Sequence, residues 1–484
     1  MTAQEIKRKL SVIFGAATLG RLKKGIFKYW RKTPTVLKAL ATLVIALNAA
    51  WQLYTRVLSP PVEVGPEKTS TSRKIEVASK EKMAFPLPDK PSIAVLPFVN
   101  MSEDPKQEFL CDGMTEAFIT ALSKVPRLFV IARSSTFTYK GKPVKVKQVS
   151  EELGVLYVLE GSVQRSGDRV RITAQLIDAL TGDHIWAERY DRDLKDIFTL
   201  QDEITFQILT ATRVKLTEGE VSLGYEKYFK GKQGLDCYLK VLEGFKYREL
   251  MSIEDNNLAR RTAEEAIAMC PEVPMAYHLM AGVNFNDYWL GSSKSLRECV
   301  EKGIEMAQKA LTLDDTYADA HATLGALYSL KKEYDKAIAQ GERTMALNPN
   351  GAYVLVRYAS TLVFIGRSEE AIPLFQKAIR LDPYGPGFYY IWLGNALALT
   401  GRFEEAVSAY KKVLQRAPNH MGAHLNLAAL YSRTGREKEA QAEAAEALRI
   451  NPRFSLEYYA KMLPFNDQSE KDRIVDDMRR AGLK

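Results

Sequence analysis

The sequence is short of the residues that most often carry metal or redox chemistry. Its 484 residues include five histidines and four cysteines. Cys111, Cys237, Cys270 and Cys299 form no C-x-x-C pair, and no histidine lies at zinc-ligand spacing from them. We therefore expect no bound metal and no cofactor. We predict that the cysteines are dispersed buried thiols, and one disulfide stays open as an alternative if most of the chain is exported.

Motifs for nucleotide and hydrolase chemistry are also missing. Residues 15–21 read GAATLGR, with Arg and Leu where a phosphate-binding loop needs Lys and Ser or Thr. His420 and His424 are four residues apart, but Met421 stands where a zinc hydrolase helix needs Glu. We interpret both histidines as packing or surface residues. No G-x-S-x-G motif occurs, and we predict no catalytic residues.

Positive charge is concentrated at the start of the chain. The net charge is +9, and residues 1–38 hold ten Lys or Arg side chains and one acidic one. The other residues hold 58 basic and 58 acidic side chains. This distribution is typical of the cytoplasmic flank of a membrane span rather than of a nucleic-acid interface. We predict a basic cytoplasmic tail over 1–38 and no nucleic-acid partner.

An uncharged window follows this tail at residues 39–55. Its 17 residues are the lower edge of the length that crosses a bilayer core, about 17–25 residues. Trp51 and Tyr54 lie near one end, where an aromatic belt would place them. We predict one transmembrane helix over 39–57 in a bacterial inner membrane, with the bulk of the chain periplasmic. A buried core helix, a cleaved signal peptide and an interfacial helix are the alternatives.

Residues 58–90 show no apolar period. They are rich in Pro, Ser, Thr, Lys and Glu, a composition that buries too little apolar surface to offset the entropy of ordering. We predict a disordered linker here that holds the following domain away from the membrane.

Order is expected from residue 91 to residue 215. Two short apolar runs, SIAVLPF and LFVIA, are typical of buried strands, and helical periods follow each of them. Residues 157–179 alternate with the strand period around a turn at Ser166, Gly167 and Asp168. An amphipathic helix over 199–216 closes the region. The pattern predicts an α/β (α+β) domain.

This region resembles a known family. The stretches PSIAVLPFVNMSEDPKQEFLCDGMTE, VIARSSTFTYKGK and ELGVLYVLEGSVQRSGDRVRITAQLIDA look like the TolB amino-terminal-like domain. That domain occurs in bacterial proteins behind class III adenylate cyclase domains or winged-helix regulators of the CadC type. The resemblance implies a sensing or assembly role. A cyclase domain would have to precede the predicted span, where 38 residues stand, so we expect only the non-catalytic half and no enzyme activity.

The chain repeats itself over residues 236–454. Four prolines that close similar segments are spaced by 34, 35 and 34 residues: Pro349, Pro383, Pro418 and Pro452. A helix–turn–helix period of this length is the tetratricopeptide repeat (TPR) signature. Gly366, Gly401 and Gly435 fall where each pair of helices turns. We predict an all-α TPR solenoid of about six units, followed by C-terminal capping helices over 455–484.

Stacked TPR units form a groove lined mainly by the first helix of each unit. The second, fifth and ninth positions of these helices should face it, and Asn426 lies beside them. They are Tyr353, Val356, Ser360, Phe388, Ile391, Asn395, Gly422, Leu425 and Ala429. This apolar lining suggests a protein or peptide partner that is apolar or extended rather than an acidic tail. The alternative is that some of these side chains pack against the next repeat.

The sequence thus predicts a non-enzymatic, membrane-anchored TPR scaffold that assembles protein partners. The alternative comes from the α/β domain, which could bind an unknown small ligand near its strand ends. The chain would then be the sensing subunit of a cyclase-type or transcriptional signalling system.

Overall fold

The computed structural model describes residues 77–212, 231–293 and 295–484. The predicted basic tail, the predicted transmembrane helix and most of the predicted linker lie outside these ranges. The chain divides into two compact units, and the description here concerns the second, Ile75–Lys484. Within the described ranges, no helix combines the length and the apolar character that crossing a membrane requires.

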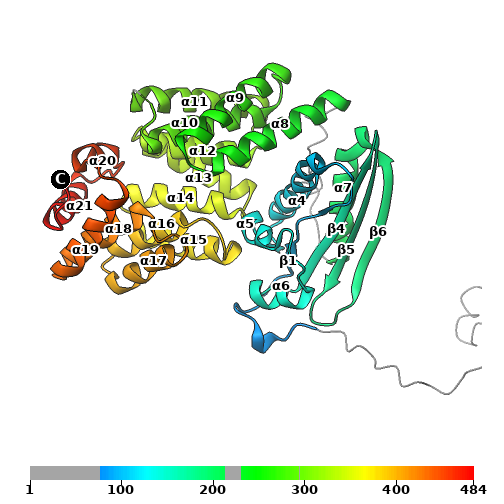
Figure 1. Ribbon diagram of the computed structural model, residues 1–484, viewed down its shortest axis with the longest axis horizontal. Helices are drawn as coiled ribbons and strands as arrows, with labels where there is room; N and C mark the ends of the chain where they lie inside the picture. Colours follow the sequence, from blue (N-terminus) through cyan, green and yellow to red (C-terminus); the bar gives the residue numbers. More distant parts are fainter. Residues whose placement is uncertain (1–76, 213–230, 294) are drawn as a thin grey trace, which may run out of the picture. The chain divides into compact units, whose positions relative to one another are not determined.

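The first part of this unit is built on a mixed sheet (Figure 1). Its strands follow the order β3-β1-β4-β5-β6, and β2 pairs with β4 as well. The strands β1, β2 and β3 run parallel to their neighbours, whereas β4, β5 and β6 form an antiparallel meander. The strand bounds are β1 Ser92–Val95, β2 Val99–Asn100, β3 Phe129–Val130, β4 Tyr157–Ser166, β5 Arg169–Asp178 and β6 His184–Asp193.

The predicted hairpin is confirmed. β4 ends at Ser166 and β5 begins at Arg169, so the turn consists of Gly167 and Asp168. Gly167 has φ +58°, a conformation that glycine adopts without the clash that a Cβ atom would cause. The turn therefore sets the register of the longest strand pair.

Helices separate the strands and cover the sheet. They are η1 Lys80–Lys82, η2 Pro105–Gln107, α4 Glu108–Ser123, α5 Arg133–Thr136, η3 Phe137–Tyr139, α6 Val146–Leu153, η4 Leu194–Asp196 and α7 Ile197–Ala211. On one face of the sheet, Ile93 and Ile172 share a buried cluster with Phe118 of α4 and Ile204 of α7. Apolar burial of this kind is the main stabilisation of such a layer.

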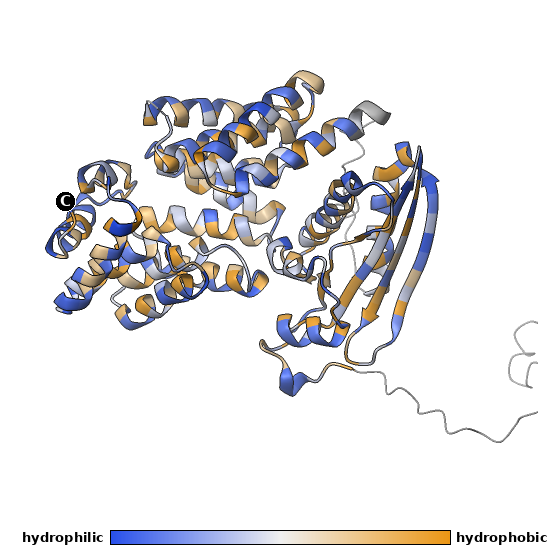
Figure 2. Ribbon diagram, in the orientation of Figure 1, coloured by the Kyte–Doolittle hydropathy of each residue, from blue (hydrophilic) through white to orange (hydrophobic). Residues whose placement is uncertain are grey.

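The outer strand is polar by contrast. Figure 2 shows that β6 is mostly hydrophilic. Arg171 of β5 lies opposite Asp191 of β6 and forms an ion pair with it, with 2.7 Å between Nε and Oδ1. Charged side chains on an edge strand reduce its tendency to pair with other chains.

Residues 77–90 correct the prediction of a linker over 58–90. The Ala78 amide donates to the Ala179 carbonyl at 2.7 Å, and the Ala84 amide donates to the Glu151 carbonyl at 2.8 Å. These residues are therefore attached to the α/β domain. The sequence did not reveal this because backbone hydrogen bonds, which depend little on residue type, hold the segment in place.

The second part is a solenoid of antiparallel helix pairs, as the 34-residue period predicts. The pairs are α8 Gly231–Glu249 with α9 Ile253–Met269, α10 Pro274–Leu290 with α11 Leu296–Leu313, α12 Ala318–Leu330 with α13 Tyr334–Leu347, α14 Ala352–Phe364 with α15 Ser368–Leu381, α16 Phe388–Leu399 with α17 Phe403–Arg416, and α18 Met421–Arg433 with α19 Glu437–Ile450. Gly366, Gly401 and Gly435 have φ values of +83°, +78° and +74°. The predicted turns between paired helices are thereby confirmed.

Two further helices follow the last pair, α20 Leu456–Met462 and α21 Gln468–Arg480. We call residues 453–466 the closing segment, because they return to earlier repeats. Tyr288 of α10 donates its hydroxyl to the Met462 carbonyl at 2.9 Å, and Tyr334 of α13 donates to the Pro464 carbonyl at 2.8 Å. The Asn466 amide donates to the Phe364 carbonyl at 2.8 Å.

The favoured prediction of four free thiols is wrong, and the alternative of one disulfide is confirmed. Cys237 of α8 and Cys270, which follows α9, form a disulfide with their Cα atoms 6.4 Å apart. The two cysteines are 33 residues apart in the sequence, and the spacing alone does not indicate that they pair. The antiparallel packing of α8 on α9 brings them together. Cys111 and Cys299 are buried free thiols, and burial raises the pKa of Cys111 to about 12.

Polar contacts join the α/β domain to the solenoid, and we call this region the junction. Asn350, in the turn after α13, donates its side-chain amide to the carbonyls of Ser123, Val125 and Leu128 at 3.0 to 3.2 Å. Its side-chain oxygen accepts from Lys90 Nζ at 3.1 Å. Both polar atoms of the buried Asn350 side chain thus have hydrogen-bond partners.

Arg380 of α15 makes the second junction contact. Its guanidinium donates to the carbonyls of Leu153 and Gly154 at 3.0 and 2.9 Å, and to that of Pro86 at 3.0 Å. The guanidinium carbon also lies 4.7 Å from the centre of the Phe129 ring. Burial lowers the pKa of Arg380 to about 10.

Two more hydrogen-bonded contacts belong to the junction. Asp382, after α15, accepts hydrogen bonds from the hydroxyls of Ser134 and Ser135 of α5, the latter at 2.6 Å. Tyr238 of α8 donates to the Gly113 carbonyl of α4 at 2.9 Å. A Cβ atom on Gly113 would lie 3.1 Å from the Tyr238 ring, so glycine permits this close approach.

Candidate functional site

A large hollow lies on the first helices of the repeats. It is a cavity of about 1050 Å³ lined by α10, α12, α14, α16 and α18 and by the closing segment. Its apolar lining is largely aromatic. The rings belong to Phe285, Trp289, Phe364, Phe388, Trp392, Tyr410, Phe454, Tyr458, Tyr459 and Phe465.

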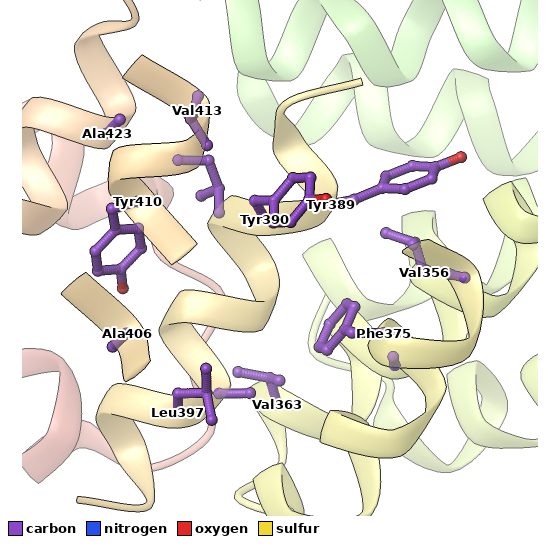
Figure 3. Close-up of a cluster of buried hydrophobic side chains, with 14 of the residues drawn as sticks. Val356, Val363, Phe375, Tyr389, Tyr390, Leu397, Ala406, Tyr410, Val413 and Ala423 are labelled. Atoms are coloured by element: carbon purple, nitrogen blue, oxygen red, sulfur yellow. The ribbon is translucent and has the colours of Figure 1, made fainter. Parts of the chain in front are cut away.

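Eight of the ten predicted groove residues line this cavity. They are Ser360, Phe388, Ile391, Asn395, Gly422, Leu425, Asn426 and Ala429. Val356 does not line it, because its side chain is 1% exposed and lies among the buried side chains drawn in Figure 3. The Tyr353 ring is also outside the lining and lies 4.7 Å from the guanidinium carbon of Arg357. Val356 therefore packs against the neighbouring helix instead of facing the cavity, which was the alternative for these positions.

Arg357, one of three arginines in the cavity wall, was not among the predicted groove residues. Its guanidinium carbon lies 4.1 Å from the centre of the Phe285 ring and 6.0 Å from that of Phe388. Its Nε is buried and donates to no acceptor in the described residues. A single charge within the otherwise apolar run AYVLVRYASTLVF was the available signal.

The closing segment forms part of the cavity wall. The ring of Phe465 lies 5.7 Å from that of Phe364, and the Trp392 ring lies 5.1 Å from Phe364 on the first helices. Trp289 and Trp392 are 6.5 Å apart. The aromatic residues thus form a continuous chain from the second repeat to the C-terminal segment, with edge-to-face geometry that favours association.

Asn395 and Asn426 in the cavity wall have polar atoms without hydrogen-bond partners among the described residues. Asn395 Oδ1 accepts from the Tyr410 hydroxyl at 2.7 Å, and the Asn395 amide nitrogen has no acceptor among the described residues. Asn426 makes no side-chain hydrogen bond within the same residues. Both can therefore pair with a ligand that offers backbone amide groups.

The interpretation of the C-terminal histidines is confirmed. His424 bonds through Nδ1 to Glu443 at 2.5 Å and through Nε2 to the Pro418 carbonyl at 2.8 Å. His420 accepts from the Ala423 amide at 3.2 Å and caps α18. The ring nitrogens of His424 are thus used in packing.

Three family models match parts of the chain. Residues 89–206 match the second domain of HilA/YgeH-like transcriptional regulators. Residues 359–420 and 397–463 match two tetratricopeptide-repeat models. The part of the solenoid from 359 to 463 is therefore made of TPR units. For the α/β domain, the match is to the HilA-like domain, and these matches do not show the TolB-like assignment.

One curated relative is similar in sequence. A protein of Rhizobium meliloti (strain 1021) named "Putative adenylate cyclase 3" is 43% identical over 258 residues, which cover 52% of this chain and 42% of the relative. The chain thus matches less than half of that protein, although the link to cyclase-related proteins is clear.

Two solved structures of TPR proteins are among the similar proteins. YrrB, described as a TPR protein with an unusual peptide-binding site, is 22% identical, with a TM-score of 0.28 and coverage of 40% of this chain and 93% of YrrB. PilF of Pseudomonas aeruginosa is 16% identical, with a TM-score of 0.35 and coverage of 47% and 96%. At these TM-scores the likeness carries no argument about ligands.

Proposed function

We propose that this chain is a non-enzymatic regulatory binding protein that holds a segment of a partner protein in the cavity of its solenoid. The observation that carries the proposal is the cavity itself, in which five successive repeats present apolar rings and unpaired amides to one space. Rigid aromatic anchors beside a few polar groups are the usual composition of a protein-binding hot spot.

A regulatory role is supported by the two similarities at the sequence level. The α/β domain matches a domain of transcriptional regulators, and about half of the chain is similar to a protein named as a cyclase. In our proposal, the junction carries partner binding in the solenoid to the α/β domain. The output comes from a cyclase or transcriptional regulator, and the described residues supply no chemistry.

We also propose that the solenoid works outside the cytoplasm, anchored by residues 39–57. The basic excess before these residues supports this orientation, and so does the disulfide between Cys237 and Cys270, because disulfides persist mainly in oxidising compartments. Reporter fusions after Lys90, one active only outside the cytoplasm and one only inside, test it. Activity of the inside reporter alone would overturn the proposed location.

Selection of random peptides displayed on phage by the full chain tests the cavity. Ala398 lines the cavity, and Ala398→Trp should fill it and abolish selection. Ala445, exposed on α19, gives the matched control, and Ala445→Trp should select the same peptides as the unchanged chain. Equal selection by both variants would place peptide binding elsewhere and refute the proposed site.

A further inference from the structure

We infer that the cavity recognises a carboxylate, and that Arg357 is the residue that binds it. The occupant is then an extended apolar peptide segment that carries one acidic group. This inference rests on the proposed function and specifies the chemistry of the partner. It revises the expectation of a purely apolar ligand, which came from helix positions that did not include Arg357.

The first argument is the setting of Arg357. The rings of Phe285 and Tyr353 lie 4.1 and 4.7 Å from its guanidinium carbon, so its orientation is fixed by stacking. Nε is buried without an acceptor in the described residues, and no ion pair of Arg357 occurs among them. The positive charge of the side chain is therefore not compensated by any described residue, which is costly in an apolar setting, and a ligand carboxylate that pairs with its terminal nitrogens would compensate it.

The second argument is the charge of the lining. Three arginines and no aspartate, glutamate or lysine line the cavity in the described part of the chain. Arg433 is paired with the buried Asp477, 2.6 Å away, a carboxylate that Arg480 shares, and Arg453 is exposed. Among the lining residues, Arg357 is thus the buried cation without an ion pair in the described part of the chain. A positive charge in a cavity with apolar walls attracts an anion over a longer range than it would in open water.

The third argument concerns the form of the anion. A guanidinium binds a carboxylate through two parallel hydrogen bonds, and the free amides of Asn395 and Asn426 lie on the next two first helices. Amide groups spaced along the wall suit the repeating amides of an extended peptide. The rings on either side then accommodate its apolar side chains.

The experiment uses two displayed libraries and the full chain. In one, the random segment is internal, so that acids can come only from Asp or Glu side chains. In the other, the random segment ends in a free carboxyl group. We expect enrichment of a carboxylate on the order of tenfold in one of them, at a fixed distance from an aromatic or aliphatic residue. Arg357→Gln should lose this enrichment while apolar preferences remain.

Two further variants make the test decisive. Arg357→Glu should reverse the preference toward Lys and Arg, which a merely structural role would not do. Arg453→Gln, the matched control at the rim, should keep the acidic preference.

The outcomes separate the two proposals. If peptides bind and Ala398→Trp abolishes binding, but acids are not enriched, the carboxylate inference fails and the proposed function stands. If Ala398→Trp has no effect, the proposed function fails first. A fatty acid found on the purified chain by native mass spectrometry, and lost in Arg357→Gln, would overturn the peptide as the occupant.

Discussion

The junction and the cavity use the same residue types in opposite ways. In the junction, Arg380 donates to three carbonyls and Asn350 to three more. In the cavity, Arg357 Nε has no acceptor and Asn426 no hydrogen bond within the described residues. Both arginines are stacked on aromatic rings, so the difference lies in the acceptors alone.

This difference separates residues that hold the structure from residues that are available for binding. A buried polar group with all its partners stabilises the folded chain, and its removal leaves other groups unsatisfied. A buried polar group without partners makes no such contribution, costs free energy while the site is empty, and is available to a ligand. The predictions below therefore pair a substitution in the junction with the same substitution in the cavity where the chain offers one.

The largest effect is expected for the disulfide, which lies in the same buried cluster as the helices of the junction. Loss of a cross-link that closes a loop of this length, 33 residues, should lower the free energy of unfolding by roughly 3–4 kcal/mol in the chain-entropy model. Denaturant unfolding of the full chain with and without reductant measures it. The double variant Cys237→Ala/Cys270→Ala should be insensitive to reductant, and an unchanged midpoint for the reduced wild type would contradict the prediction.

The two arginines come next. Arg380→Met should lower the free energy of unfolding by about 3 kcal/mol, because three carbonyls lose a charged donor. Arg357→Met should change it by less than about 1 kcal/mol, because the lost stacking on the Phe285 and Tyr353 rings is offset by removal of the buried, unpartnered Nε donor. Chemical unfolding of the two variants side by side provides the measurement. Equal losses would show that Arg357 is also a structural residue.

A matched pair of asparagines sharpens the comparison. Asn350→Leu should cost about 2 kcal/mol because the carbonyls of the α4–β3 loop lose their donor. Asn426→Leu removes no hydrogen bond and should be within about 0.5 kcal/mol of wild type. Thermal unfolding followed by circular dichroism distinguishes them, and a reversed order of the two would refute the assignment of Asn350 to the junction.

The smallest expected effect concerns His278, a buried side chain that is hydrogen-bonded and differs in protonation between the folded and the unfolded chain. His278 lies 2.9 Å from the Tyr317 hydroxyl and 3.0 Å from the Thr323 hydroxyl. Burial, reinforced by the charges of Arg248 and Arg357, holds its pKa well below the usual value. The folded chain therefore keeps His278 neutral, whereas the unfolded chain binds a proton below about pH 6.5.

Stability due to His278 is complete above that pH and decreases as the pH falls. Between pH 7.5 and 5.5, wild type should lose about 1 kcal/mol more than His278→Phe. The difference between the two pH profiles isolates this residue from the other titrating groups. Parallel profiles would show that His278 binds the same number of protons in the folded and the unfolded chain over this pH range.

Local patterns were sufficient for most of the fold. The 34-residue period predicted the helix pairs, and glycine at the turns and at Gly167 predicted conformations that the structure shows. The order of residues 77–90 was missed and the pairing of Cys237 with Cys270 was not predicted, because both depend on segments that meet only in the folded chain. The same holds for the junction, where Asn350 bonds to residues more than 200 positions away.

The lining of the cavity was predictable only where it depends on the position of a residue within its own helix. Helical register brought Phe388, Asn395 and Leu425 to the lining, because the side that faces the groove repeats with each unit. Register alone did not show that Val356 packs into the core or that Arg357 lies between rings from different repeats. Such neighbours come from the stacking of repeats, which residue spacing does not encode.

The closing segment gives this solenoid a fixed count of units. An open TPR array can gain or lose a repeat, because each unit contacts only its neighbours. Here Tyr288 in the second pair bonds to Met462 beyond the sixth, so an inserted or deleted unit would separate the two ends of that bond. Duplication of a repeat would therefore lengthen this solenoid without disrupting it only if the closing segment changed as well.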